Sequence, residues 1–172
     1  MTTLAELYTE LGRYAEAESL FTTSLERARE IYGEEHPKTL VALDRFADLE
    51  MDRGFWDKSE DYRRRVLEAQ RRVIGPDHPR TLETESSLAW LLHLQGRLDE
   101  AEELAVHAYE TALRDHGRDA MVTVERANVM ASVYLEQGRY NLAEDLHRTN
   151  LDIVTREYGA AHTNSITSRN NL

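Results

Sequence analysis

Three histidines recur in one short motif and are the first candidates for chemistry. His36, His78 and His162 each stand three residues after a glycine. Histidines hold zinc when their rings converge within a few ångströms. Here they are separated by 42 and 84 residues, and the His-Glu-x-x-His helix motif is absent. The spacing favours contacts within a repeated loop and at the start of the next helix, so we predict neither a metal site nor a cofactor.

Carboxylates recur as well, at Glu18, Glu60, Glu102 and Glu144. Their 42-residue spacing predicts the same local bond in every repeat, at the start of a helix, where acidic residues are favoured. No carboxylate pair stands apart from this repeat, and the sequence has no cysteine, glycine-rich phosphate loop or triad pattern. The sequence therefore predicts a protein that is not an enzyme.

The elements that position these side chains are marked by glycines. All eight glycines lie 21 residues apart, at 12, 33, 54, 75, 96, 117, 138 and 159. Alternate glycines have different surroundings: those at 12, 54, 96 and 138 precede a small residue and glutamate, and the others open a longer loop. The true period is therefore 42 residues, and repetition at a fixed period indicates a repeat array. Glycine supplies the left-handed residue at a helix end.

Apolar residues recur at helical spacing between the glycines. Each unit is predicted to contain helix A, a tight turn, helix B and a longer loop. We expect helices near 2–11, 13–32, 37–52, 55–73, 79–94, 97–116, 121–136 and 139–158, and a ninth starting near 164. The fold class is all-α, an α-solenoid of about four helix–turn–helix repeats. Its parts are a partial repeat 1–36, repeats 37–78, 79–120 and 121–162, and a partial repeat 163–172.

The repeat resembles a known family. Gly-Arg-Tyr-Ala-Glu-Ala-Glu-Ser-Leu-Phe at 12–21 and Gly-Pro-Asp-His-Pro-Arg-Thr-Leu at 75–82 resemble the 42-residue, kinesin-light-chain-like subclass of tetratricopeptide repeats. That subclass also occurs as C-terminal arrays on nucleotide-binding (NB-ARC/STAND) signalling proteins. The resemblance implies a right-handed superhelix in which A helices line a concave face and B helices lie outside. It also implies a scaffold for protein binding.

The family's groove register, carried onto this chain, selects one face of the A helices. Its residues are Glu6, Glu10, Asp44, Asp48, Met51, Asp52, Glu83, Ser86, Trp90, His93, Glu125, Asn128, Leu135, Glu136 and Asn170. Eight are acidic and none is Lys or Arg, and a cleft of one sign attracts the opposite charge. We predict that this face binds a protein or peptide with basic residues, with Met51, Trp90 and Leu135 as apolar anchors. The alternative is a solvated acidic face that keeps the array soluble.

The sequence departs from relatives that bind acidic cargo. Those repeats carry Leu-Asn-Asn-Leu-Ala in helix A with basic residues nearby, whereas here the asparagine pair survives only at Asn170-Asn171-Leu172. The clamp that other tetratricopeptide repeats use for a C-terminal carboxylate needs lysines. Lys38 and Lys58 are the only lysines, and neither is on the selected face. The sequence therefore argues against both activities.

The net charge limits the classes of partner that the chain is expected to bind. Lys and Arg total 21 and Asp and Glu total 32, which gives a formal charge of −11. Nucleic acids and anionic membranes favour basic surfaces, so we exclude both. The run Arg63, Arg64, Arg65, Arg71 and Arg72 is interleaved with acids, which favours i,i+4 ion pairs on a solvated outer face. No signal peptide or apolar run of ~20 residues is visible, so we predict a cytoplasmic location.

The repeat register also places both ends of the sequence inside a repeat. Leu4 has the register of Phe46, Leu88, Met130 and Leu172. An array cut within a helix leaves an apolar face uncovered. We interpret the sequence as part of a longer array, with a naturally short protein as the alternative, and expect the ends to permit head-to-tail self-association. The alternative function is thus a structural or self-association module within a larger signalling protein.

Overall fold

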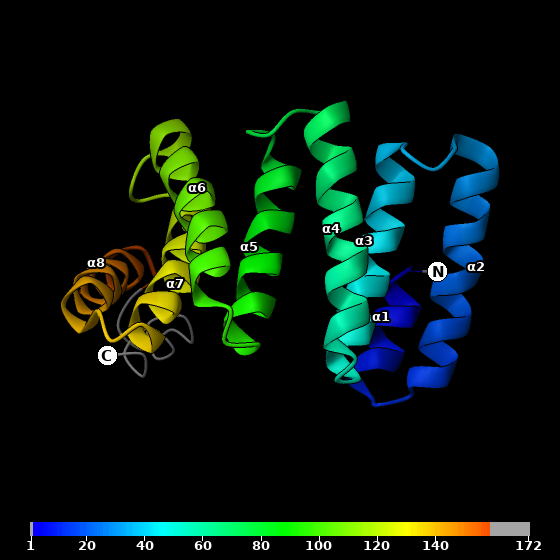
Figure 1. The fold of residues 1–172 in the computed structure, drawn as a ribbon, viewed down its shortest axis with the longest axis horizontal. Coiled ribbons are helices and arrows are strands. Elements are labelled where there is room, and N and C mark those ends of the chain that lie inside the picture. Colours follow the sequence, from blue (N-terminus) through cyan, green and yellow to red (C-terminus); the bar gives the residue numbers. More distant parts are fainter. Residues whose placement is uncertain (1, 159–172) are drawn as a thin grey trace. The chain divides into compact units, whose positions relative to one another are not determined.

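The computed structural model describes residues 2–158 of the chain, and within that range every regular element is an α-helix. The helices are α1 (Thr2–Glu10), α2 (Tyr14–Tyr32), α3 (Pro37–Asp52), α4 (Trp56–Val73), α5 (Pro79–Leu94), α6 (Leu98–His116), α7 (Met121–Glu136) and α8 (Tyr140–Tyr158) (Figure 1). The predicted helix bounds are confirmed to within one residue at each end. The ninth helix expected from the sequence lies outside the described residues. No helix in the described part is both long and apolar enough to cross a bilayer.

The tight turns between A and B helices share one hydrogen-bonding pattern. After α1, the N–H of Gly12 donates to the Thr9 carbonyl (2.9 Å) and the N–H of Arg13 donates to the Tyr8 carbonyl (2.8 Å). This is the Schellman motif, which requires a left-handed residue, and Gly12 has φ of 71°. The same pair of bonds closes α3, α5 and α7 at the glycines 42 residues apart. The prediction that these glycines end helices is confirmed in each of the four turns.

The longer loops use histidine to start the next helix. The ring Nδ1 of His36 accepts a hydrogen bond from the backbone N–H of Lys38 (3.2 Å), and Nδ1 of His78 accepts one from Arg80 (3.2 Å). Proline follows each histidine in the first turn, where its missing N–H costs nothing. The predicted loop and helix-start role is confirmed for both, and His162 lies outside the described residues.

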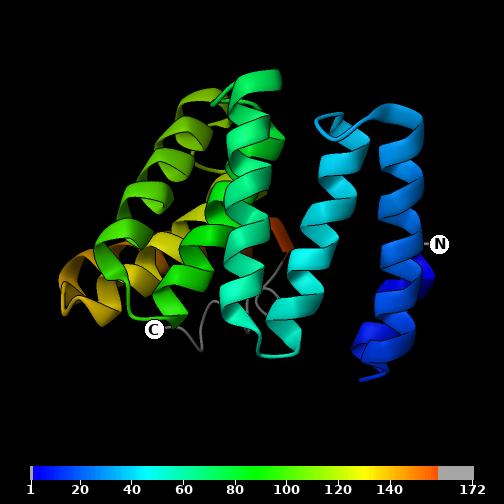
Figure 2. The same cartoon turned by 45° about the vertical axis from the view of Figure 1, so that its right-hand side comes forward.

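The chain divides into two compact units, Met1–Leu91 and Leu92–Leu172. In the first, which we call unit 1, α1 packs on α2, α2 on α3 and α3 on α4 (Figure 2). Its core centres on aromatic rings: Phe21 of α2 lies 6.3 Å from Phe46 of α3, and Phe46 lies 5.7 Å from Tyr62 of α4, edge to face. Alanine is buried where the helices cross, as at Ala5 and Ala47, both 0% exposed.

In the second unit, unit 2, α7 packs on both α6 and α8. Alanines on α6 and the cluster of Val124, Ile153 and Val154 fill its interior. The Asn150 side chain of α8 is buried there, and its Nδ2 donates to the Val124 carbonyl (3.2 Å) and to Asn128 Oδ1 (2.8 Å).

Two of the four recurring glutamates, Glu18 and Glu102, differ from the helix-start role predicted for them. Glu18 is the fifth residue of α2, and its Oε2 accepts from Arg53 Nη1 (3.0 Å), at the end of α3. In unit 2, Glu102 accepts from Gln137 Nε2 (2.7 Å) and from Arg139, on either side of the α7–α8 turn. These two carboxylates therefore join a B helix to the end of the following A helix. The 42-residue spacing of the glutamates does not reveal this contact between helices.

Candidate functional site

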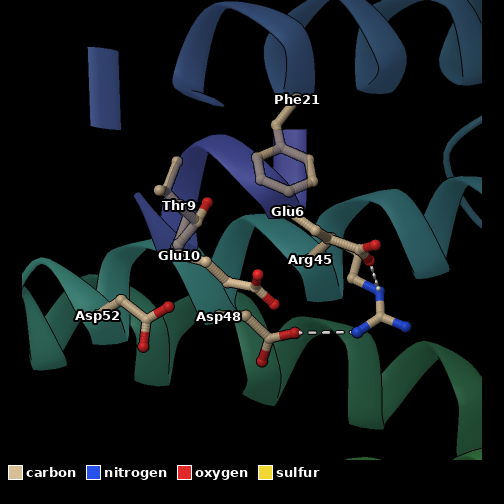
Figure 3. A pocket seen from close by; sticks show the side chains of 8 residues that line it. Glu6, Thr9, Glu10, Phe21, Arg45, Asp48 and Asp52 are labelled. Atoms are coloured by element: carbon tan, nitrogen blue, oxygen red, sulfur yellow. Dashed lines mark hydrogen bonds and ion pairs between the residues drawn. The ribbon is translucent and has the colours of Figure 1, made fainter. Parts of the chain in front are cut away.

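Two A helices of unit 1 bring four of the predicted site residues around one pocket. Glu6 and Glu10 of α1 face Asp48 and Asp52 of α3, with Phe21 at the inner wall (Figure 3). The cavity holds about 180 Å³. That is below the roughly 300–1,000 Å³ typical of small-molecule sites, so it suits one protruding side chain better than a free ligand.

An arginine absent from the predicted site also lines this pocket. Arg45 Nε lies 3.4 Å from Glu6 Oε1, and Arg45 Nη1 lies 3.4 Å from Asp48 Oδ2 (Figure 3). All three side chains are about 40% exposed, so water screens both ion pairs and their contribution to stability is small. Arg45 nevertheless reduces the negative charge that a partner would meet.

A second arginine, from α4, also pairs with Asp48. Arg63 of α4 is 1% exposed, and its Nη2 lies 2.5 Å from Asp48 Oδ1. Its Nη1 donates to Ser59 Oγ (2.6 Å), and that hydroxyl donates to the Ala47 carbonyl (2.7 Å). The predicted solvated outer face for the basic run is therefore wrong for Arg63, because its side chain points into the helix pair.

The rest of the basic run largely follows the prediction. Arg64, Arg65 and Arg72 pair with the acids four residues before them, at 2.8, 3.9 and 3.8 Å. Arg71 instead reaches α5, where its Nη2 lies 2.7 Å from the buried carboxylate of Glu85. The run thus serves ion pairing, as predicted, but partly between helices.

Asp44 is the most perturbed carboxyl group of this surface. Its pKa is raised to about 6, first by burial and then by the neighbouring carboxylates of Asp48 and Glu83, against the opposing effect of Arg63 and Arg45. Its Oδ1 is buried without a hydrogen-bond partner among the described residues. Burial and Asp48 also raise the pKa of Asp52. The negative charge of one carboxylate on this surface therefore makes ionisation of Asp44 and Asp52 less favourable.

Asp44→Asn is expected to stabilise the protein at pH 7 by about 1–3 kcal/mol, because a raised folded pKa means that ionisation opposes folding. For an acid with a raised pKa, stability is greatest below its unfolded value and is lost as pH rises through about 6. Urea unfolding at values from about pH 3 to about pH 7, which bracket the unfolded and folded pKa of Asp44, should therefore show the free energy of unfolding of the wild type falling below that of the variant as pH rises. Glu26→Gln, an exposed acid on α2, controls for the change in net charge. A difference between Asp44→Asn and wild type that stays constant with pH would contradict this explanation.

Six carboxylates therefore define what we call the acidic surface: Glu6, Glu10, Asp44, Asp48, Asp52 and Glu83. Two guanidinium groups, those of Arg45 and Arg63, pair with it at the distances given above. Among residues 2–158, neither Glu10, Asp52 nor Glu83 forms an ion pair. The surface keeps an excess of negative charge, although less than the predicted face without Lys or Arg would have.

The other predicted site residues of unit 1 differ from one another in exposure and in contacts. Met51 is half-buried, with Arg63 Nη1 3.6 Å from its sulfur, and the Ser86 hydroxyl donates to the Leu82 carbonyl (2.9 Å). Trp90 is 37% exposed, which leaves part of its ring available for contact.

In unit 2, the predicted residues lie on α7 and at the end of α5. Glu125, Leu135 and Glu136 are exposed, and His93 is half-buried. Asn128 is half-buried and already engaged by Asn150. Asn170 lies outside the described residues. Within residues 2–158, no group of three or more His, Cys, Asp or Glu side chains is arranged to hold a metal ion.

Comparison with known proteins agrees with this architecture. The family model for the tetratricopeptide repeat matches residues 1–50, 42–114 and 122–172. The chain belongs to the tetratricopeptide repeat family. Its fold is an all-α tetratricopeptide repeat solenoid, as its structural neighbours show. No curated protein sequence matches the chain.

The similar solved structures include TPR-like repeats of a kinesin light chain. BtubC (BKLC) from P. vanneervenii superposes with a TM-score of 0.86 at 20% identity, over 98% of this chain and 67% of that one. Kinesin light chain TPR-like repeats from Podosopora anserina superpose with a TM-score of 0.83 at 20% identity, over 99% of this chain and 81% of that one. At this identity the likeness concerns the fold of the repeats.

Proposed function

We propose that this tetratricopeptide repeat chain is a protein-interaction module that binds a basic segment of a protein partner on the acidic surface. The family consists generally of protein-interaction modules, which supports the class of function. The observation that carries the finer proposal is the excess of carboxylates on α1 and α3 around a pocket of side-chain size. Opposite charge speeds encounter more than it adds affinity, so the pocket must supply the specificity.

The pocket offers a lysine or arginine side chain two carboxylates that form no ion pair within residues 2–158. Glu10 and Asp52 line opposite sides of it, and Phe21 provides an apolar wall for the methylene stem of the incoming residue. A charge-assisted hydrogen bond to either carboxylate is stronger than a neutral one. A cation near Asp44 would also favour its ionised form, so binding should tighten as pH rises through about 6.

The test is a peptide-display selection against the full chain, followed by measurement of Kd for the recovered peptides. The variant Glu10→Lys, Asp52→Lys reverses the free charges of the pocket without touching the pair between Arg63 and Asp48. The matched control, Glu26→Lys, Glu30→Lys, makes the same charge change at exposed positions of α2. We expect the pocket variant to lose at least about 10-fold in affinity, or ~1.4 kcal/mol, and the control to lose much less.

Two results would overturn the proposal. Recovered peptides that lack basic residues would exclude the charge argument. Equal losses in both variants would show that overall charge, rather than the pocket, attracts the peptide. Circular dichroism of each variant shows whether a loss reflects unfolding.

A further inference from the structure

Arg45 shows how this protein holds a guanidinium group between two A helices. Its Nε lies 3.4 Å from Glu6 Oε1 of α1, and its Nη1 donates to Asp48 Oδ2 of α3 at 3.4 Å. Different nitrogens of one side chain therefore contact carboxylates of both helices (Figure 3). Glu6 and Asp48 stand 42 residues apart, so they occupy equivalent positions of consecutive repeats.

A second pair of carboxylates follows one helical turn further on. Glu10 follows Glu6 by four residues on α1. Asp52 follows Asp48 by four residues on α3, so each carboxylate lies one turn beyond its predecessor on the same helix face. Glu10 and Asp52 both line the pocket, and Asp52 lies at the end away from the Arg45 guanidinium (Figure 3). Within residues 2–158 neither forms an ion pair, so this pair lacks the cation that Arg45 supplies to the first.

A guanidinium group suits carboxylates on two walls of a pocket better than an ammonium group does. Arginine presents its N–H donors in a rigid planar fork, whereas the lysine ammonium is a compact and strongly hydrated charge. The apolar wall at Phe21 can receive the methylene stem of the side chain. The Thr9 hydroxyl, which also lines the pocket, donates to the Ala5 carbonyl (3.0 Å), so its oxygen can accept a hydrogen bond from a further N–H.

The later A helices do not repeat this second pair. The position equivalent to Glu10 and Asp52 holds Leu94 in α5 and Glu136 in α7. Of the A helices within residues 2–158, only α1 and α3 are therefore consecutive and acidic at this position. The described part of the chain offers one such pair of carboxylates, which corresponds to one arginine side chain of a partner.

We propose that the pocket is an arginine site, in which the guanidinium of a partner's arginine bridges Glu10 of α1 and Asp52 of α3. Arg45 bridges the preceding pair of carboxylates in the same way. The assignment rests on the proposed function and specifies which basic residue of the partner enters the pocket. Lysine should not replace this arginine. Dimethylation of the guanidinium keeps its charge but blocks bidentate hydrogen bonding, so it should weaken binding.

The test titrates the isotope-labelled full chain with N-acetyl-arginine amide and with N-acetyl-lysine amide, and follows the backbone amide signals of the pocket by NMR. The two probes carry the same charge at neutral pH, so charge alone does not distinguish them. We expect the arginine probe to bind at least about 10-fold more tightly, because it adds a charge-assisted hydrogen bond to the second carboxylate. The asymmetrically dimethylated arginine probe should bind about as weakly as the lysine probe.

Two variants locate the binding. Glu10→Gln and Asp52→Asn each remove one charge of the pair and keep the shape of the side chain. In each of them the arginine probe should lose most of its advantage over the lysine probe, because only one carboxylate remains. Glu26→Gln makes the same charge change at an exposed position of α2 and should keep the wild-type preference.

Three results would overturn the arginine site: no binding of the arginine probe, equal affinity for the two probes, or equal arginine affinity in wild type and both pocket variants. These failures are distinct from a failure of the proposed function. Display peptides that depend on Glu10 and Asp52 but carry only lysine would support binding of a basic segment and overturn its assignment to arginine.

Discussion

Arg63→Ala is expected to lower the free energy of unfolding of unit 1 by about 3 kcal/mol. The substitution removes a buried side chain between α3 and α4 and leaves the Ser59 hydroxyl with one bond fewer. It also removes the guanidinium group that offsets the adjacent carboxylates of Asp44 and Asp48. Lost packing and increased repulsion act in the same direction, which is why the effect should be large.

Two companion variants identify the cause. Arg64→Ala removes the next arginine, whose pair with Glu60 is on the surface, and should cost less than about 0.5 kcal/mol. Arg63→Met with Asp48→Asn removes both charges and keeps most of the volume, so it should recover most of the loss. Urea unfolding of the four proteins checks this. An Arg63→Ala variant that unfolds at the wild-type urea concentration would mean that the buried pair is energetically neutral.

The positions of helices could be read from the sequence because their ends are determined locally. Gly12 and Gly54 adopt positive φ that other residues resist, and the two bonds that close each helix involve residues within five positions. The histidine contacts at His36 and His78 are equally local. Local rules of this kind repeat with the sequence period, so the period was sufficient to find them.

The charge balance of the site could not be read in the same way. The predicted face was chosen one A helix at a time, but Asp48 is paired with Arg63 from a different helix. One sequence signal did exist. The positions equivalent to Arg63 hold Phe21, Ala105 and His147, and all three side chains are buried. An arginine at this position therefore had to be buried and paired.

In the A helices, the position that helix packing requires and a position of the predicted site are next to each other in the sequence. Ala5, Ala47, Ala89 and Ala131 are identical in every repeat and 0% exposed, because only a small side chain fits where the helices cross. The next residue in each repeat is Glu6, Asp48, Trp90 and Ser132. Helix packing thus restricts the alanine position to a small residue, whereas the residue after it can differ between repeats. Such a surface can be specific for a partner without altering the fold, which is what the proposed function requires.

Leu49→Ala is expected to lower the free energy of unfolding by about 3 kcal/mol, whereas Leu7→Ala, the same substitution at the equivalent position of α1, should cost less than about 1 kcal/mol. Leu49 is 1% exposed beneath α2 and leaves a cavity when shortened, while Leu7 is 48% exposed. Both changes alter helix propensity equally, so their difference measures burial alone. Urea unfolding in dilute solution, where copies of the chain are separate, checks this. Equal losses would mean that Leu7 is as well covered as Leu49 in the folded protein.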